Sequence, residues 1–401
     1  MEKMGSRIFG KIGIVTFVAL LLCGVLSSVS AEDKGDDSRL SARPLGDAME
    51  TLASKVSIGG YYELEYEDAR RVNGSAGEAD FDQHRFILFF GAKPHERIRM
   101  FSELEFEHGA AAADLKLEQA WLEFEIENWL NLRGGIDLIP VGRLNRNHDG
   151  NHRDFIFRPV TDERLIPSTW YEAGVSLNGS FTEKVNYTFG ISNGLRESTG
   201  VGGISEIRSM RRTNALSEND NNNNKAISGR IVASPWLGTE FGISGYNAKY
   251  SSSSPGQNSI GLPNGDSDIT FLAFDWFIPW KAFEFKGEYV NVEKDPEAGG
   301  MTGAAGGYGE LAYHFFPSFL DESWLGRGFE DPTFTALLRW ETIDFETPGD
   351  QDLLDRNILS VGLNYRPIEQ MAFKVSYDFE DRKKAGVDNV DKFGAGMVLG
   401  F

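Results

Sequence analysis

Residues 373–380 read FKVSYDFE, an unbroken alternation of apolar and polar side chains. Successive side chains of a β-strand point to opposite faces of the sheet, so the pattern predicts a strand with one apolar and one polar face. Residues 393–401 alternate in the same way up to a final phenylalanine. The period of a helix is found only in the short stretch 44–54, so we predict an all-β chain.

Similar segments recur along the chain after residue 55. Most are close to ten residues long, which is the length that a tilted strand needs to cross a bilayer. There are sixteen of them, and an even number is typical of bacterial barrels. They cover residues 56–66, 82–93, 98–108, 115–126, 130–137, 170–179, 184–193, 225–233, 239–250, 267–276, 282–292, 306–316, 333–345, 357–366, 371–380 and 392–401.

The connections between these segments alternate in length. Those after even-numbered segments have three to five residues, except for residues 317–332, whereas those after odd-numbered segments have six to thirty-two. Short turns on one side and long loops on the other are typical of outer-membrane barrels. We therefore predict a 16-stranded antiparallel transmembrane β-barrel, porin-like, over residues 56–401. The sequence assigns no role to the aromatic connection 317–332.

The N-terminus indicates export. Three basic residues precede an apolar run at 12–26, and Val29 and Ala31 occupy the −3 and −1 positions of a cleavage site. This layout predicts a signal peptide at 1–31 rather than a membrane anchor, for which the run is short. Residues 32–55 are then a short N-terminal periplasmic segment, and the outer membrane of a Gram-negative bacterium is the expected location.

Composition excludes several classes of function. The formal net charge of −20 argues against nucleic acid as a partner. The only cysteine, Cys23, lies in the predicted signal peptide, so the exported chain has no thiolate for catalysis. We find no G-x-S-x-G or H-E-x-x-H motif and predict neither an enzyme nor a cofactor. His148 and His152 flank a glycine-containing loop, which favours solvated side chains over a metal site.

If the apolar face of each strand meets lipid, the polar face lines the interior. The residues that we expect on this pore wall are charged, and rings of charge set ion selectivity in channels. They include Arg85, Glu103, Glu105, Glu123 and Arg133. The expected partners are therefore outer-membrane lipid, lipopolysaccharide and small hydrophilic solutes.

The loop at 138–169 is the most informative connection. It continues through IPVGRLN at 139–145 and ends in IPSTWYEAG at 166–174, and the preceding strands contain QHRFILFFGAKPHERIRMFSELEFEH at 83–108. Over residues 80–180 the chain resembles the phosphate-selective porin O and P family. The resemblance implies a sixteen-stranded channel whose third long loop folds inward and narrows the lumen. Unlike the phosphate channels of that family, this lumen is rich in glutamate.

The same loop is basic in an acidic protein, and we predict that it forms the pore constriction or a solute-binding site. The residues concerned are Arg143, Arg146, His148, Arg153 and Arg158. Two interpretations have equal weight: the cations create an anion preference, or they pair with wall glutamates and fix the loop.

The favoured function is passive diffusion of small hydrophilic solutes or ions. The alternatives are a substrate-specific receptor or porin, for example for a siderophore, and a structural barrel that houses a partner protein. The sequence leaves homotrimer formation open.

Overall fold

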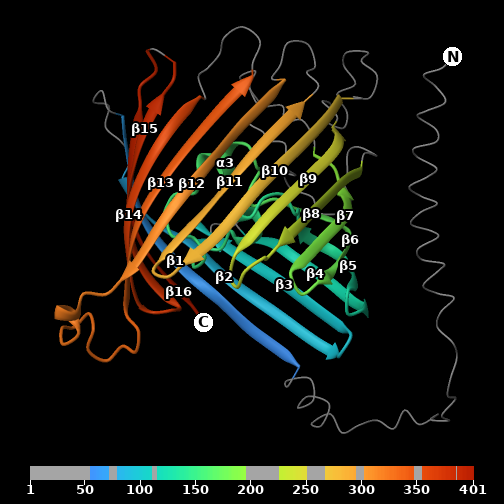
Figure 1. Cartoon of the computed structure of the whole chain (residues 1–401), viewed down its shortest axis with the longest axis horizontal. Helices are drawn as coiled ribbons and strands as arrows, with labels where there is room; N and C mark the ends of the chain where they lie inside the picture. Colours follow the sequence, from blue (N-terminus) through green and yellow to red (C-terminus); the bar gives the residue numbers. More distant parts are fainter. Residues whose placement is uncertain are drawn as a thin grey trace, which may run out of the picture. The chain divides into compact units, whose positions relative to one another are not determined.

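The computed structural model describes residues 55–71, 79–110, 115–195, 225–250, 267–294, 302–346, 355–384 and 386–401. Within these ranges, sixteen antiparallel strands pair with their sequence neighbours, and β1 pairs with β16 (Figure 1). The sheet is therefore a closed barrel, as predicted. The predicted signal peptide, the N-terminal periplasmic segment and the helix at 44–54 lie outside the described residues.

The strands lie close to the predicted segments, and several are longer. They are β1 (Val56–Arg71), β2 (Ala79–His95), β3 (Ile98–Glu107), β4 (Leu115–Glu127), β5 (Leu130–Leu138), β6 (Tyr171–Thr182), β7 (Val185–Asn193), β8 (Lys225–Ala233), β9 (Glu240–Tyr250), β10 (Ser267–Trp280), β11 (Phe283–Lys294), β12 (Gly303–Phe315), β13 (Thr333–Glu346), β14 (Arg356–Ile368), β15 (Met371–Arg382) and β16 (Val390–Gly400). The ladder continues beyond the apolar alternation because backbone pairing does not require apolar side chains: Glu67 pairs with Gly394 and Arg71 with Val390.

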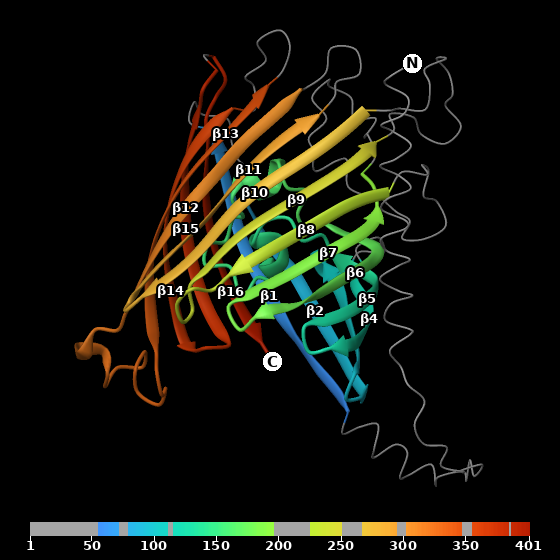
Figure 2. The ribbon, with the colours of Figure 1, turned by 45° about the vertical axis from the view of Figure 1, so that its right-hand side comes forward.

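The two ends of the barrel differ in their connections. At the short-turn end, pairs such as 96–97 and 369–370 join consecutive strands. At the long-connection end, the links include 139–170 and 194–224. The exception is the connection 316–332 at the short-turn end, which projects beyond the strands and exposes Phe319 and Trp324 (Figure 2).

The outer face of the barrel is apolar. Side chains such as Leu363, Val375 and Leu399 are exposed there, as the alternation predicts. Near the short-turn end, rings from β10 to β15 follow one another at centroid distances of 4.7–6.3 Å, in the order Trp280, Phe283, Tyr313, Phe315, Phe334, Tyr365 and Phe373. Such aromatic belts mark a membrane–water interface in barrels. No helix among the described residues is long and apolar enough to cross a membrane.

The inner face is not polar throughout, which corrects the expectation of a uniformly polar lumen. Ile269, Phe271 and Ala273 on β10 are buried inside the barrel, while Leu272 and Phe274 are exposed outside it. A strand that is covered on both faces carries apolar residues on both. On the inner side these residues pack against the β5–β6 connection, residues 139–170, which we call the interior loop.

Candidate functional site

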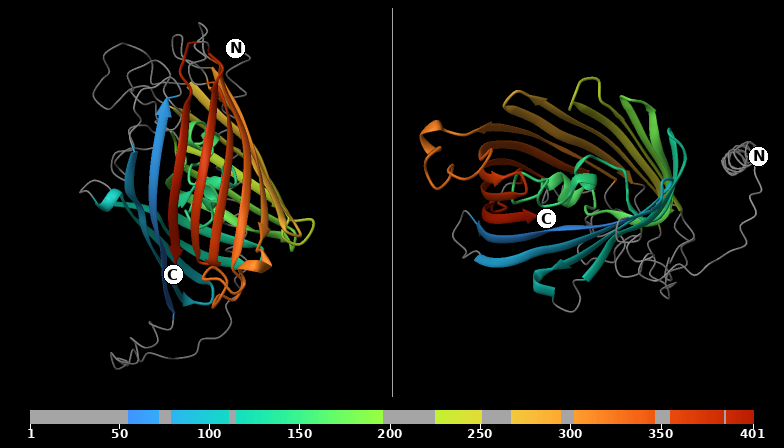
Figure 3. Two further views of the ribbon diagram at one scale, coloured as in Figure 1. Left: turned by 90° about the vertical axis from the view of Figure 1, so that its left-hand side faces the viewer. Right: turned by 90° about the horizontal axis from the view of Figure 1, so that it is seen from below.

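The interior loop crosses the inside of the barrel, as the view along the barrel shows (Figure 3). It first reaches β9 and β11: the Gly142 N–H donates to Ser244 Oγ on β9 at 3.0 Å, and the Arg143 N–H donates to Glu288 Oε2 on β11 at 2.7 Å. Gly142 has φ +72, and a Cβ there would lie 2.2 Å from Glu288 Oε1, so a glycine allows this close approach.

The middle of the loop binds β1, β14 and β15. Arg153 donates to Glu63 Oε1 at 3.1 Å, and Lys374 donates to the carbonyl oxygens of Gly150 and Arg153 at 2.6 Å each. Asn364 donates to the carbonyl oxygen of Asp154 at 2.9 Å. Buried charges are stable only when paired and hydrogen-bonded. These contacts therefore fix the middle of the loop against the side of the barrel where the sheet closes.

The last part of the loop contains the short helix α3 (Val160–Arg164), inside the barrel beside β12 and β13 (Figure 1). Glu341 on β13 accepts from the first N–H of α3. Trp170, which is fully buried, packs against Tyr246 and Phe271 at centroid distances of 4.5 and 5.2 Å. An apolar core thus lies within the barrel.

Three of the five predicted constriction residues make contacts that hold the interior loop in place. Arg153 pairs with Glu63, and Arg158 donates to Ser168 Oγ at 2.8 Å. His148 is buried, which corrects the expectation of a solvated side chain: its Nε2 lies 3.0 Å from Glu118 Oε2 and 3.8 Å from Glu103 Oε1. The second histidine of this stretch, His152, is exposed as expected.

The ion pair of His148 changes its protonation. Burial lowers the pKa of this imidazole, but the nearby carboxylates of Glu103 and Glu118, the second of which is hydrogen-bonded to Nε2, outweigh that effect and raise the pKa to about 10. His148 is therefore a cation at neutral pH, held between carboxylates.

The other two predicted residues, Arg143 and Arg146, line a cavity of about 200 Å³ beside β7, β8 and β9. Its wall also includes Arg230, Thr188 and Glu240. Arg143 Nε lies 3.7 Å from Glu240 Oε2, and Arg230 is paired with Asp275 on β10. Within the described ranges of the chain, Arg146 has no carboxylate within ion-pairing distance, and its side chain is exposed to the barrel interior.

The predicted wall residues all lie on the inner face, but most are already paired. Arg85 Nε lies 3.0 Å from Glu105 Oε1, and Glu103 accepts from Gln119. Glu123 accepts from Arg133 at 2.7 Å and also binds Arg99. The arrangement reduces the free negative charge of this wall, and its part in selectivity stays a prediction.

Sequence reasoning missed Glu118, the main partner of His148. A β-bulge causes this: Glu103 pairs with Gln119 and the next residue, Leu104, with Leu117, so that Glu118 is extra and turns inward. Strict alternation from Glu123 places Glu118 on the outer face. Glu288, which accepts from the Arg143 N–H, was missed as well, although Lys286, Glu288 and Val290 alternate with outer residues along β11.

Comparison with known proteins finds one partial match in sequence and several solved structures of the same fold. No protein-family model matches the chain. An uncharacterised protein of Aquifex aeolicus (strain VF5) is 33% identical over 164 residues, which are 39% of this chain and 36% of that protein. The match thus spans about a third of that relative's length.

Three solved structures resemble this one over most of its length. Vibrio cholerae OmpT has a TM-score of 0.55 and 13% identity, and the alignment covers 86% of this chain and 97% of that one. An anion-selective porin from Comamonas acidovorans has a TM-score of 0.57 and 11% identity, with 86% and 99% covered. The outer-membrane channel DcaP of Acinetobacter baumannii has a TM-score of 0.57 and 10% identity, with 86% and 97% covered. The fold is that of outer-membrane porins.

Proposed function

We propose that the chain is an outer-membrane porin through which small hydrophilic solutes and ions diffuse passively. The closed barrel has the apolar outer face and aromatic belt that a membrane requires. Its inner face carries paired charges and a cavity lined by polar side chains. The resemblance of residues 80–180 to the phosphate-selective porin O and P family is part of the proposal.

One observation carries the expected anion preference: the interior loop is fixed on several sides, yet it leaves Arg143 and Arg146 beside a cavity. A cation whose charge is not cancelled by a carboxylate attracts anions, most strongly where the passage is narrow. Arg146 meets this condition better than Arg153, whose charge is cancelled by Glu63. The anion preference therefore depends on the cavity beside β7 to β9 rather than on all five predicted residues.

The proposal includes the export route and orientation. Residues 1–31 act as a cleaved signal peptide, residues 32–55 stay in the periplasm, and the long-connection end faces the cell exterior, where lipopolysaccharide surrounds the barrel. A homotrimer belongs to the same proposal, since one solved form of Vibrio cholerae OmpT is described as a trimer.

The structural barrel that houses a partner protein is a weaker alternative. The interior loop contacts β1, β9, β11, β13 and β15, and buries an apolar core inside the barrel. A folded partner would have to displace these contacts, which include the buried Arg153–Glu63 ion pair, and a buried ion pair is costly to break.

Planar-bilayer recording of the purified full-length protein tests the proposed function. We expect stepwise openings with a linear current and, in a salt gradient, a reversal potential on the anion-selective side. Membrane insertion without any conductance would contradict the porin assignment. A conducting but cation-selective pore would contradict only the role of Arg143 and Arg146.

A further inference from the structure

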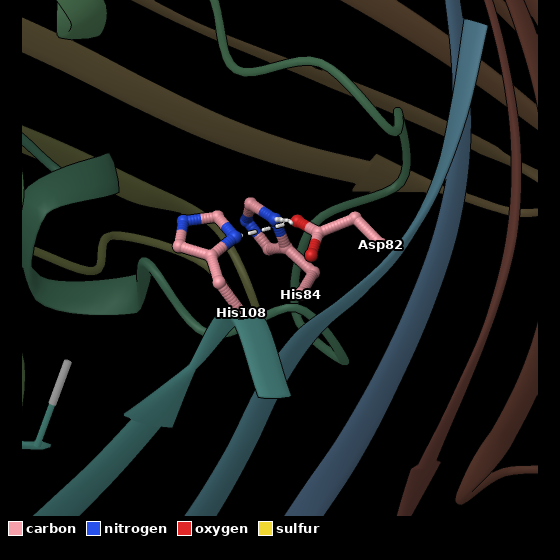
Figure 4. Close-up of side chains that lie close together, drawn as sticks. All are labelled: Asp82, His84 and His108. Atoms are coloured by element: carbon pink, nitrogen blue, oxygen red, sulfur yellow. Dashed lines mark hydrogen bonds and ion pairs between the residues drawn. The ribbon is translucent and has the colours of Figure 1, made fainter. Parts of the chain in front are cut away.

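Three potential metal ligands converge near the long-connection end of the barrel (Figure 4). His84 Nδ1 lies 3.1 Å from Asp82 Oδ2 on the same strand, β2. His108 Nδ1, from the turn that follows β3, lies 2.8 Å from the same oxygen. The two imidazole rings are perpendicular, with centroids 5.7 Å apart. Two chain segments thus bring two imidazoles to one carboxylate oxygen.

The distances are close to those between neighbouring ligands of one metal ion, although somewhat shorter. Zinc binds histidine nitrogen and carboxylate oxygen at roughly 2.0–2.2 Å, so adjacent ligands of a tetrahedral site lie roughly 3.3 Å apart. The two nitrogen–oxygen distances of 3.1 and 2.8 Å are shorter than this, and small rotations of the side chains would open the necessary space. Two imidazoles and one carboxylate also form a frequent catalytic zinc ligand set, which leaves one position open.

The backbone is shaped to hold these side chains together. The pairing of β1 with β2 contains a bulge between the Glu63–Arg85 and Glu65–Asp82 pairs. Because of this bulge, Asp82 and His84 face the inner side of the barrel, as Arg85 does. His108 has φ +50, a left-handed conformation that histidine, like asparagine and aspartate, adopts more often than most other residues with a side chain. The turn after β3 thereby directs this imidazole towards Asp82.

The turn is also tied back to β2, because the Gly109 N–H donates to Gln83 Oε1 at 3.1 Å. Gln83 lies between the two ligands of β2. His108 is therefore held over Asp82 by the backbone of its own turn, in addition to the contact between the two side chains.

A second carboxylate stands beside the cluster. Glu65 is 2% exposed, and its Oε2 lies 3.5 Å from His84 Nδ1. In the part of the chain that the structure describes, Glu65 Oε1 has no hydrogen-bond partner, and its closest cation is Arg153 at 3.8 Å. Oε2 is therefore the oxygen of Glu65 that faces the cluster, whereas Oε1 faces Arg153.

We propose that Asp82, His84 and His108 bind one divalent transition-metal ion of the zinc class, with Glu65 as the neighbouring carboxylate. The site lies outside the pore cavity of Arg143 and Arg146 and does not depend on the proposed transport function. Solvent reaches it, since the side chains of Asp82, His84 and His108 are 29%, 23% and 52% exposed. Mixed nitrogen and oxygen ligands favour zinc and its neighbours over magnesium or calcium.

Titration calorimetry of the purified, untagged full-length protein with Zn²⁺ tests the site. The wild type should bind one ion per chain, and His84→Ala and His108→Ala should each weaken binding by at least the 10–100-fold that is typical for loss of a supporting partner. His152→Ala is the matched control, because it removes an exposed histidine near Asp149 in the interior loop. Failure of the wild type to bind, or the same affinity in all three variants, would overturn the proposal.

Histidine footprinting removes the dependence on correctly folded variants. In the wild type, Zn²⁺ should protect His84 and His108 from acylation by diethylpyrocarbonate and leave His152 and His95 reactive. Equal protection of His152, or none at His84 and His108, would also overturn the site. Co²⁺ should report the same site by the visible absorption of a nitrogen- and oxygen-ligated ion, and a spectrum of hexaaqua cobalt would contradict it.

Discussion

Replacement of Arg146 by Gln should shift the channel towards cations, and the structure gives the size of the shift. An ion inside the cavity of about 200 Å³ lies roughly 6 Å from a guanidinium group at its edge. At that distance a unit charge in water contributes about 0.7 kcal/mol. The loss of one charge destabilises an anion and stabilises a cation by this amount. The anion-to-cation ratio should therefore fall by about 1.4 kcal/mol, which is roughly tenfold.

Arg143→Gln should have a smaller effect, because Glu240 already offsets part of its charge. Both shifts should shrink in 1 M salt, where the Debye length is about 3 Å. The assay is the reversal potential in a salt gradient, measured at low and high ionic strength. Arg327→Gln, in the exposed 316–332 connection, is the control for a general change of net charge.

The reasoning would be refuted by an unchanged reversal potential in Arg146→Gln, or by an equal shift in Arg327→Gln. The first result would place the cavity outside the path of the ions, and the second would mean that the shift reflects net charge alone.

Four other predictions concern loop docking, stability and membrane insertion. His148→Gln leaves Glu103 and Glu118 without their cation and should weaken docking of the interior loop by about 3–5 kcal/mol. The pKa of His148 is raised in the folded protein, so the contribution of this residue to docking of the interior loop should be complete below about pH 6.5 and disappear as the pH rises through about 10. Trypsin cleavage within the loop, which should become faster as the loop undocks at high pH, measures this loss. Trp170→Ala should cost about 3–5 kcal/mol of unfolding free energy in a denaturant titration, and a change below 1 kcal/mol would mean that the loop core contributes little. Leu338→Arg, on the outer face in the middle of β13, should reduce insertion into vesicles by about 2–4 kcal/mol, whereas Asn186→Arg, on the inner face, should insert normally; equal defects would mean that the two faces are exchanged.

The sequence predicts the barrel well because its environment imposes a simple pattern. Lipid outside and polar groups inside require a period of two, and β15 shows it without interruption. The pattern fails where the environment changes. Phe271 on β10 faces the interior although it is apolar, because the interior loop covers it. The alternation within β10 alone does not indicate that the interior loop covers its inner face.

The candidate site was predicted in part. The basic composition of the loop identified Arg143 and Arg146, but it could not separate them from Arg153, whose partner Glu63 is ninety residues away. Pairing across such a distance depends on the three-dimensional path of the loop. The bulge at Glu118 is a local irregularity that strict alternation ignores, and so the partner of His148 was invisible until the strand register was known.

The central claim is that ions pass through the cavity beside β7 to β9, and a single-cysteine experiment tests it most directly. The only cysteine of the chain, Cys23, belongs to the predicted signal peptide, so Val232→Cys introduces one thiol into the cavity wall. Ser360→Cys, fully buried on β14, is the control. Single-channel current through Val232→Cys should fall after addition of a charged methanethiosulfonate reagent, and current through Ser360→Cys should not change. Current through Val232→Cys that is unaffected by complete modification of the thiol would contradict the claim.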